Sequence, residues 1–507
     1  MELPGLSHGG LGFGNICMSA IFFLSVYIIS TIIYSLTLHP LASYPGPTWT
    51  RASRIPFWVA CLTGDQVLWM HNLHTKYGPV VRYSPNDLSF IDRGGDAWKA
   101  IHGHEKGGRE LPKAREWFVE PANGIYGINS APAHEDHRRF RKLFAPAFSE
   151  RALKSNEPVL RKHVDLLVTK LGGIADEGRA VDMVKMFQFT TFDFMGDLTF
   201  GLPLGLLEGL AYSPWVEAVF DSIKVIPVAQ IIQYYPWLYS LFQRFEPRFV
   251  KDMKYNHFQH SADRVDRRLA RGSPEEQPDI WTMVLAAKGD QKLSLEEMYC
   301  HADVFMLAGS ETSGSTLSGL TSHLLSNPEK LAILTKHIRS LFRNEHEITL
   351  KSTAGIEYLN ACIQEALRLY PPVPVGVPRV VTETGLTIRN QWIAPGTRVS
   401  VHHYATYRNP LNFANADTFA PERWLAGGQQ DAAYKADRRE SCQPFAYGPR
   451  DCLGRNLAMH EMRYIMARVL FKFDLELRRE SEGWDGQRAF VLWEKKALMC
   501  RLRAAAA

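Results

Sequence analysis

The sequence predicts a mainly α-helical protein with small β-sheets, and three observations support that class. Helical patterns dominate the chain, for example over residues 158–171 and 247–269, each with a proline placed to start the helix. A single helix of more than thirty residues is predicted in the second half of the chain, as argued below. Strand signals are few and short, and they cover residues 80–83, 88–91, 397–401 and, in a late alternating region, 489–502.

The N-terminal run over residues 16–38 contains no charged residue. Its 23 residues, at about 1.5 Å each, would span roughly 35 Å as a helix, which is enough to cross a bilayer core. A cleaved signal peptide would have a shorter apolar core behind a basic segment, whereas Glu2 is the only charge before this run. Basic residues follow the run, so a retained anchor would leave the body in the cytosol. A buried core helix is the third reading.

The anchor divides the chain into four expected parts. Residues 1–15 form a short lumenal N-terminus and residues 16–38 form a transmembrane signal anchor. Residues 39–50 form a proline-rich hinge, and within it the stretch 39–47, which contains three prolines, is expected to be stiff and non-helical. Residues 51–507 form one large catalytic domain.

Composition excludes several other classes of protein. The 507 residues carry a net charge of only +5, which gives no argument for nucleic-acid binding, and 46% of them are hydrophobic, which supports a large core. Seven cysteines, an odd number with no Cys-x-x-Cys pair, indicate neither a disulfide framework nor a zinc site. They fit a reducing compartment.

The longest predicted helix begins at Ser294, where Ser294 and Glu297 have the spacing of a capping box. It ends near Asn327, directly before Pro328. A helix of this length, roughly 50 Å, crosses an entire domain. Its middle, residues 305–309, is apolar almost all round and should be buried.

At the centre of that helix, residues 308–312 read Ala-Gly-Ser-Glu-Thr. Gly309 is unfavourable inside a helix by about 1 kcal/mol relative to alanine, so small residues here suggest a need for space. Ala308 and Thr312 share a face, and Glu311 adjoins the Thr312 hydroxyl. Oxygen activation needs a small groove for O2 and a supply of protons, which Thr312 and Glu311 could provide. The alternative is a helix whose small residues serve only close packing.

One cysteine near the C-terminus lies in a loop, residues 444–454, that suits a thiolate ligand. Gly448 and Gly454 allow tight turns that bring backbone N–H groups to the sulfur of Cys452. Phe445 can shield the sulfur from water, and Arg450 can bind a haem propionate. A cysteine thiolate bound to haem iron favours O–O cleavage. The alternative is a structural loop with a buried free cysteine.

Taken together, Phe445, Gly448, Arg450, Cys452 and Gly454 resemble the haem-binding signature of the cytochrome P450 superfamily. Residues 308–312 resemble its oxygen-binding helix, and the similarity extends to residues 492–496. It is closest to fungal microsomal members of secondary metabolism, such as the isotrichodermin and averantin hydroxylase group. The resemblance implies a cytochrome P450 fold behind an N-terminal transmembrane helix, with haem as cofactor and Cys452 as the axial ligand of its iron.

The same resemblance implies roles for residues that the sequence alone would leave ambiguous. Glu365 and Arg368 are three apart on one helix face, and alone they would be read as a surface salt bridge. By resemblance they join Arg423 in a buried structural charge triad beneath the haem.

Further residues are expected around the cofactor. Arg379, Arg141 and His137 would face the haem propionates, and Ala308 would line the oxygen side. Many family members carry tryptophan where His137 stands, and each of the three basic residues could instead be a solvated surface charge.

The substrate side is the family's variable part, and its expected residues are Ile125, Tyr126, Phe305, Val373 and Val375. The apolar run over residues 225–232 could dip into a membrane interface or could belong to the core. Either arrangement suits an apolar substrate that arrives from lipid.

We therefore predict a haem-thiolate monooxygenase that inserts one atom of O2 into an apolar small molecule, a terpenoid or polyketide intermediate of fungal secondary metabolism. NADPH-cytochrome P450 reductase is the expected electron donor and cytochrome b5 a second candidate. The expected location is the endoplasmic reticulum membrane, with a single span and a cytosolic catalytic domain. A haem-thiolate isomerase or dehydratase that needs no O2, and a non-catalytic haem-binding protein, are the rival functions. The sequence does not specify the substrate, the oxidised position or the oligomeric state.

Overall fold

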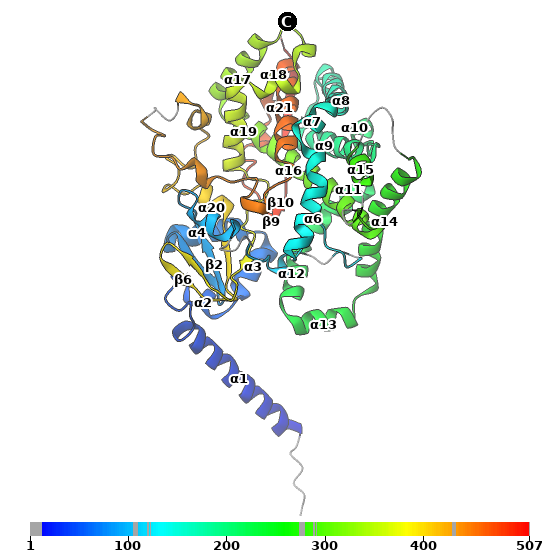
Figure 1. Ribbon diagram of the computed structural model, residues 1–507. Coiled ribbons are helices and arrows are strands. Elements are labelled where there is room, and N and C mark those ends of the chain that lie inside the picture. The colour runs from blue at the N-terminus through cyan, green and yellow to red at the C-terminus, as the bar shows by residue number, and fades with distance from the viewer. Residues whose placement is uncertain are drawn as a thin grey trace, which may run out of the picture.

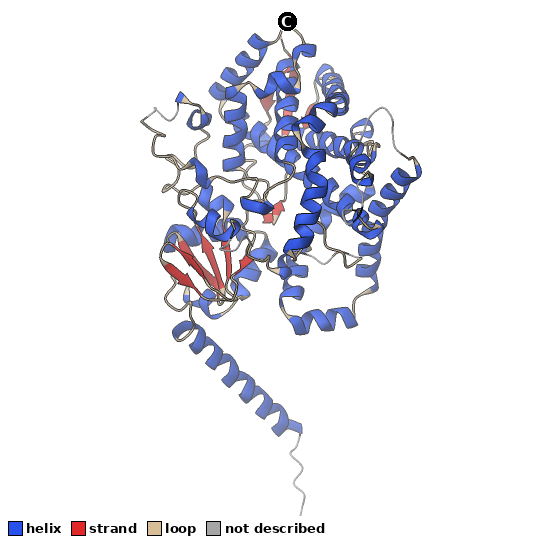
Figure 2. Ribbon diagram, viewed as in Figure 1, coloured by secondary structure: helices blue, strands red, loops and turns tan. Residues whose placement is uncertain are grey.

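The computed structural model describes residues 13–104, 110–118, 121, 123–272, 279–286, 289, 292–427 and 432–505. Helices make up most of the body, and the strands gather mainly in one sheet on its lower left side (Figures 1 and 2). The predicted class, mainly α with small sheets, is confirmed. Helix α16 passes through the middle of the helical part (Figure 1).

Helix α1 (Phe13–Thr37) extends away from the body (Figure 1). Among the described residues, one helix is long and apolar enough to cross a membrane, and it is α1, over Gly14–Thr37. Most of the expected lumenal N-terminus, residues 1–12, lies outside the described residues. The guanidinium of Arg82 donates to the carbonyls of Ser35 at 2.8 Å and Leu41 at 3.2 Å. These bonds tie the end of α1 and the start of the predicted hinge to the body.

The largest sheet has four strands in the order β1-β2-β7-β4, with β2 and β7 parallel and the other neighbours antiparallel. Its strands span Val80–Ser84 (β1), Asp87–Phe90 (β2), Arg398–Val401 (β7) and Arg379–Val380 (β4). Three of these four match the short strand signals of the sequence. The helices next to this sheet in the chain are α2 (Thr48–Ala52), α3 (Ile55–Thr63), α4 (Gln66–Tyr77), α5 (Asp96–His102) and α20 (His403–Tyr407).

Three smaller sheets complete the β-structure of the described residues. Antiparallel strands in the order β3-β11-β8 join the middle of the chain to its end, and two hairpins pair β5 with β6 and β9 with β10. Their bounds are Ala180–Asp182 (β3), Leu386–Ile388 (β5), Gln391–Ile393 (β6), Phe473–Leu477 (β8), Ala489–Phe490 (β9), Leu492–Trp493 (β10) and Met499–Ala504 (β11).

The helical part buries the largest hydrophobic cluster of the protein. Its helices are α6 (His134–Phe144), α7 (Glu150–Ser155), α8 (Glu157–Asp176), α9 (Met183–Phe200), α10 (Leu206–Gly209), α11 (Pro214–Ile223), α12 (Ile226–Tyr234), α13 (Pro236–Arg244), α14 (Arg248–Ala270), α15 (Ile280–Leu285), α16 (Leu295–Leu325), α17 (Pro328–Leu341), α18 (Leu350–Ala354), α19 (Glu357–Leu369) and α21 (Arg455–Lys472).

Helix α16 begins and ends where the sequence predicts. The Ser294 side chain accepts a hydrogen bond from the amide of Glu297, and the Glu297 carboxylate accepts one from the amide of Ser294. An N-cap of this kind stabilises a helix by about 1 kcal/mol. The helix runs for 31 residues and ends before Pro328.

Small residues let α9 pack directly on the centre of α16. A Cβ added at Gly309 would lie 2.7 Å from the Met195 side chain, so α9 fills the space that the missing side chain leaves. One residue further, the Thr191 hydroxyl donates to the carbonyl of Ser310 at 3.0 Å, and the Ser310 hydroxyl donates back to the carbonyl of Thr191 at 3.3 Å. Close packing therefore explains Gly309, which was expected to open a groove.

Candidate functional site

The loop before α21 holds Cys452 in a fixed turn. The amide of Cys452 donates to the carbonyl of Phe445 at 2.8 Å, and the amide of Asp451 donates to the carbonyl of Gly448 at 3.0 Å. Gly448 has a φ of +81°, and a Cβ added there would lie 2.0 Å from the carbonyl oxygen of His102. Only glycine fits this position, because both its positive φ and the carbonyl of His102 at the end of α5 exclude a side chain.

Cys452 is accessible, unlike the other cysteines of the body. All seven cysteines are described, and five are buried, while Cys17 lies on the isolated helix α1. Although the side chain has exposed surface, the protein atoms crowded around its sulfur keep water away and raise the pKa of the Cys452 thiol, and a hydrogen bond from the amide of Gly454 opposes that rise. The guanidinium of Arg455 lies 5.6 Å from the centre of the Phe445 ring, which fixes the ring beside the loop.

Basic side chains gather on one side of this loop. Arg450 donates to Glu110 at 2.7 Å and to the carbonyl of Ala131 at 2.6 Å. Burial, together with the charges of Arg450 and Lys113, lowers the pKa of His137 to about 3. Burial and the charges of nearby arginines also lower the pKa of Lys113 well below its ordinary value. Positive charge is therefore concentrated here, with Glu110 as its nearest acid in the described chain.

Two buried side-chain nitrogens in this cluster lack a hydrogen-bond partner among the described residues, Nε of Arg379 and Nε2 of His102. Arg379 is 3% exposed, and its Nη1 donates to the carbonyl of Leu111 at 3.1 Å. Burial and the charge of Arg450 lower its pKa to about 10. A buried cationic group with unused donors is costly unless an anion completes it, so the cluster suits an anionic group.

Three of the predicted cofactor residues, Arg379, Arg450 and His137, lie together in this cluster. The cluster also contains Lys113 and His102, which the sequence analysis did not single out. Lys113 and His102 had no motif around them, so nothing in the sequence distinguished them from surface charges. The charge of Arg141 acts on His137 of this cluster, but its guanidinium pairs with the Asp451 carboxylate at 2.6 Å. It therefore braces the residue next to Cys452.

The centre of α16 has one accessible face. Ala308 is exposed and Thr312 half-buried, although the helix is otherwise buried over most of its second half. The Thr312 hydroxyl donates to the carbonyl of Ala308 at 2.7 Å. Accessible surface in the middle of a core helix shows that open space lies beside Ala308 and Thr312.

Glu311 lies on a different face of α16 from its neighbour Thr312. Its carboxylate forms an ion pair with Lys495 and accepts hydrogen bonds from Gln188 Nε2 at 2.9 Å and from Ser315 Oγ at 3.3 Å. Successive helical residues point about 100° apart, so adjacency in sequence did not place the acid beside the hydroxyl. The expected side-by-side arrangement of Glu311 and Thr312 is therefore wrong in this structure.

The loop with Ile125 and Tyr126, both half-buried, packs against α16. A Cβ at Gly127 would lie 3.3 Å from the Val304 side chain, and the amide of Ile128 donates to His301 at 3.1 Å. These contacts place the loop about one helical turn before Ala308.

The other expected substrate residues divide into two groups. Phe305 is 6% exposed and packs against the rings of Phe144 and Phe148, and Val375 is 0% exposed. These two side chains belong to the core, which leaves them little surface for a ligand. Val373 is half-buried and retains accessible surface.

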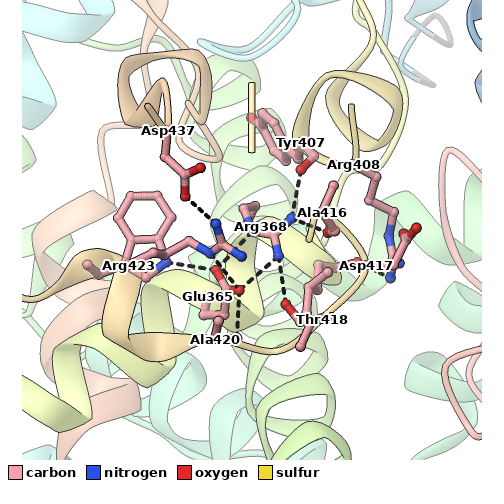
Figure 3. Close-up of polar contacts among 12 residues, drawn as sticks. Glu365, Arg368, Tyr407, Arg408, Ala416, Asp417, Thr418, Ala420, Arg423 and Asp437 are labelled. Atoms are coloured by element: carbon pink, nitrogen blue, oxygen red, sulfur yellow. Dashed lines mark hydrogen bonds and ion pairs between the residues drawn. The ribbon is translucent and has the colours of Figure 1, made fainter. Parts of the chain in front are cut away.

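Glu365, Arg368 and Arg423 form a buried ionic network (Figure 3). All three side chains are 0% exposed. The Glu365 carboxylate accepts bonds from Arg368 Nε and Nη2, each at 2.8 Å, from Arg423 Nε at 3.0 Å, from the amide of Ala420 at 2.9 Å and from Trp424 Nε1 at 2.8 Å. The two guanidiniums also donate to Asp437 and to the carbonyls of Tyr407, Ala414, Ala416 and Thr418. The pair is therefore not the surface salt bridge that its spacing alone would suggest.

Comparisons with a family model and with known proteins point to the same family. A family model described as Cytochrome P450 matches residues 49–501. Cytochrome P450 monooxygenase efuB of Hormonema carpetanum is 41% identical over 471 residues, which cover 92% of each chain. Cytochrome P450 monooxygenase FUM2 of Gibberella moniliformis is 40% identical over 468 residues, or 92% of this chain and 98% of that one. Trichothecene C-4 hydroxylase of Trichoderma arundinaceum is 39% identical over 466 residues, or 90% and 91%.

Proposed function

This chain belongs to the cytochrome P450 family and is a haem-thiolate monooxygenase, as predicted, and we propose that its substrate is an apolar small-molecule intermediate of fungal secondary metabolism. The relatives support the substrate class, since one is named for hydroxylation of a trichothecene. When bound through a cysteine thiolate, haem activates O2 so that one oxygen atom enters the substrate. The observation that carries our assignment of the site is the accessible Cys452 in its glycine-dependent loop.

We assign Cys452 as the ligand of haem iron. The amide of Gly454 lies where it stabilises a thiolate, and the Phe445 ring lies in the same loop, near the Arg455 guanidinium. The buried basic cluster fits the two haem propionates, because the buried Arg379 cation has an unpartnered Nε that an anion would satisfy, and His102 Nε2 beside it also lacks a partner. Arg450 would supply further positive charge there, and His137 and Lys113, whose pKa values are lowered, would add hydrogen-bond donors. Ala308 would face the opposite side of the cofactor.

Proton supply on the accessible face of α16 is assigned to Thr312, with Glu311 as the acid behind it. The Thr312 hydroxyl donates a hydrogen bond to the carbonyl of Ala308, so its oxygen can still accept a hydrogen bond from the open side. A proton on the Glu311 carboxyl could reach Thr312 Oγ1 only after the carboxyl turns from its present partners.

Electrons would come from NADPH through the separate NADPH-cytochrome P450 reductase, with cytochrome b5 as a second donor. Exposed basic residues around the cysteine loop support a negatively charged partner. They are Arg138 and Lys142 on α6 and Arg455 at the start of α21. Opposite charges steer association and fix the orientation of a docked partner.

We place the protein on the endoplasmic reticulum membrane, held by α1, with the body in the cytosol. Exposed apolar side chains on α12 and α13 support contact with lipid, since Val228 is 42%, Trp237 67% and Leu241 49% exposed. In Figure 1, α13 lies on the same lower side of the body as α1. An apolar substrate could then arrive from the bilayer.

The proposal is tested with the full chain in membranes, supplied with reductase and NADPH. The substrate is the metabolite purified from a strain in which the gene is disrupted. With ¹⁸O2 the product should gain one heavy oxygen atom, and with H2¹⁸O it should gain none. Conversion without O2 or NADPH would instead support the isomerase or dehydratase.

A further inference from the structure

A buried carboxylate, Glu110, lies inside the basic cluster, and both of its oxygens are bound. The Nε of Arg450 donates to Oε1 at 2.7 Å, and each of these two side chains is 2% exposed. The Nδ1–H of His134, at the start of α6, donates to Oε2. The arginine two residues before Cys452 therefore already pairs with an acid of the protein's own.

The backbone fixes Glu110 in this position. The stretch of chain that begins with it runs beside β4, where the amide of Val380 donates to the carbonyl of Pro112 at 2.9 Å. Arg379 Nη1 donates to the carbonyl of Leu111, the residue next to Glu110, at 3.1 Å. The acid is therefore held between the cysteine loop and the arginine with the unpartnered Nε.

Glu110 carries a negative charge that acts on the rest of the cluster. Burial alone would raise its pKa, but the hydrogen bond and charge of Arg450, together with those of His134, outweigh burial and hold the pKa below its ordinary value. The charge of Glu110 in turn opposes the lowering of the pKa values of three basic residues, which are Arg379, Lys113 and His137. The acid therefore offsets positive charge throughout the cluster.

Stability alone is a weak explanation for this acid. The cost of removing two charges from water offsets most of the attraction within a buried ion pair, so such a pair adds little net stability. Charge beside a redox cofactor has a different effect, because the reduced iron carries one electron more than the oxidised iron. A nearby cation favours the reduced state, and a nearby anion favours the oxidised state.

We propose that Glu110 is a positioning residue that acts through Arg450: by offsetting the arginine's charge beside the propionates, it lowers the one-electron reduction potential of the haem iron. The electron comes from the reductase, and Glu110 neither gains nor loses a proton. The lower potential makes the first electron transfer less favourable, which limits the NADPH consumed when no substrate is bound. This inference rests on the proposed assignment of Cys452 and the basic cluster as the haem site.

The test compares wild type with two replacements of the acid. Glu110→Gln removes the charge but keeps the size and an acceptor oxygen for Arg450, and Glu110→Asp keeps the charge. Glu135→Gln is the matched control, because it removes an exposed carboxylate next to His134. The reduced carbon monoxide spectrum of each full-length protein is recorded first. If wild type lacks the thiolate band, the proposed haem site fails before the role of Glu110 is in question.

A redox titration of the full-length proteins, followed by absorption spectroscopy, measures the potential without turnover. At the wild-type midpoint, Glu110→Gln should raise the ratio of reduced to oxidised iron about three- to tenfold, where tenfold corresponds to about 59 mV for one electron. Glu110→Asp and Glu135→Gln should stay within about twofold of wild type. An unchanged ratio in Glu110→Gln, or equal shifts in Glu110→Gln and Glu110→Asp, would overturn the inference. Loss of haem from Glu110→Gln would also overturn it, because the acid would then serve to build the pocket.

Consumption of NADPH without substrate tests the effect on electron supply. With the same amount of reductase, Glu110→Gln should consume NADPH about threefold faster than wild type, and Glu110→Asp should match wild type. Equal rates in Glu110→Gln and wild type would overturn the role of Glu110 in limiting electron supply.

Discussion

Replacing Glu365 with glutamine should destabilise the protein through two buried arginines. Glu365 is fully buried, and it accepts five hydrogen bonds, four of them from Arg368, Arg423 and Trp424 side chains. Without its charge, the two guanidiniums retain only the Asp437 carboxylate. An uncompensated buried charge costs about 3–5 kcal/mol. An unfolding entropy of about 2.1 cal/mol/K per residue gives about 1 kcal/mol/K for this chain, so the midpoint should fall by roughly 3–5 °C.

The assay is thermal unfolding of the full chain in detergent, followed by circular dichroism and by loss of the carbon monoxide band. Glu357→Gln is the control, since it removes an exposed carboxylate from the same helix, and it should change the midpoint by less than about 1 °C.

Burial alone would raise the pKa of Glu365, but the charges of Arg368 and Arg423 outweigh it and hold the pKa below its ordinary value of 4.5. The contribution of Glu365 is therefore present above pH 4.5 and is lost as pH falls through the lowered pKa. A Glu365→Gln midpoint within 1 °C of wild type at pH 7 would refute this reasoning.

Three further predictions concern the haem loop, the oxygen side and the anchor. Gly448→Ala should prevent haem incorporation, because its Cβ would meet the His102 carbonyl at a left-handed backbone position; a normal carbon monoxide band per milligram of protein would contradict this. Thr312→Ala should keep haem and substrate-induced spectral shifts but lower product per NADPH by up to about 10²-fold, with peroxide or water formed instead; an unchanged ratio would place the proton route elsewhere. Carbonate extraction should leave the full chain in the membrane pellet and release most of a variant that lacks residues 2–38; full release of the intact chain would exclude a retained anchor.

Local signals in the sequence predicted much of the fold. The capping box at Ser294 and the proline at 328 set the ends of α16, because caps and prolines act within one helical turn. The strands β1, β2 and β7 were marked by short β-branched and apolar runs. The loop around Cys452 was recognisable because its glycines and its cysteine lie within a few residues of one another.

Long-range contacts explain what the sequence did not reveal. Glu311 meets Lys495, 184 residues later, and no local pattern signals that pair. Helix α16 is apolar almost all round at its centre, so periodicity could not tell that Phe305 faces the core while Ala308 faces open space. Lys113 joins the basic cluster only because the fold brings it against Arg379, with which it forms a β-bridge.

The reduced carbon monoxide spectrum of Cys452→Ser tests the central assignment most directly. Wild type should show the long-wavelength Soret band that is typical of thiolate ligation, and so should Cys17→Ser, which changes the other accessible cysteine far from the body. Cys452→Ser should lack that band, whether or not haem is retained. If Cys452→Ser keeps the long-wavelength band, Cys452 is not the iron ligand and the site described here is not the catalytic centre.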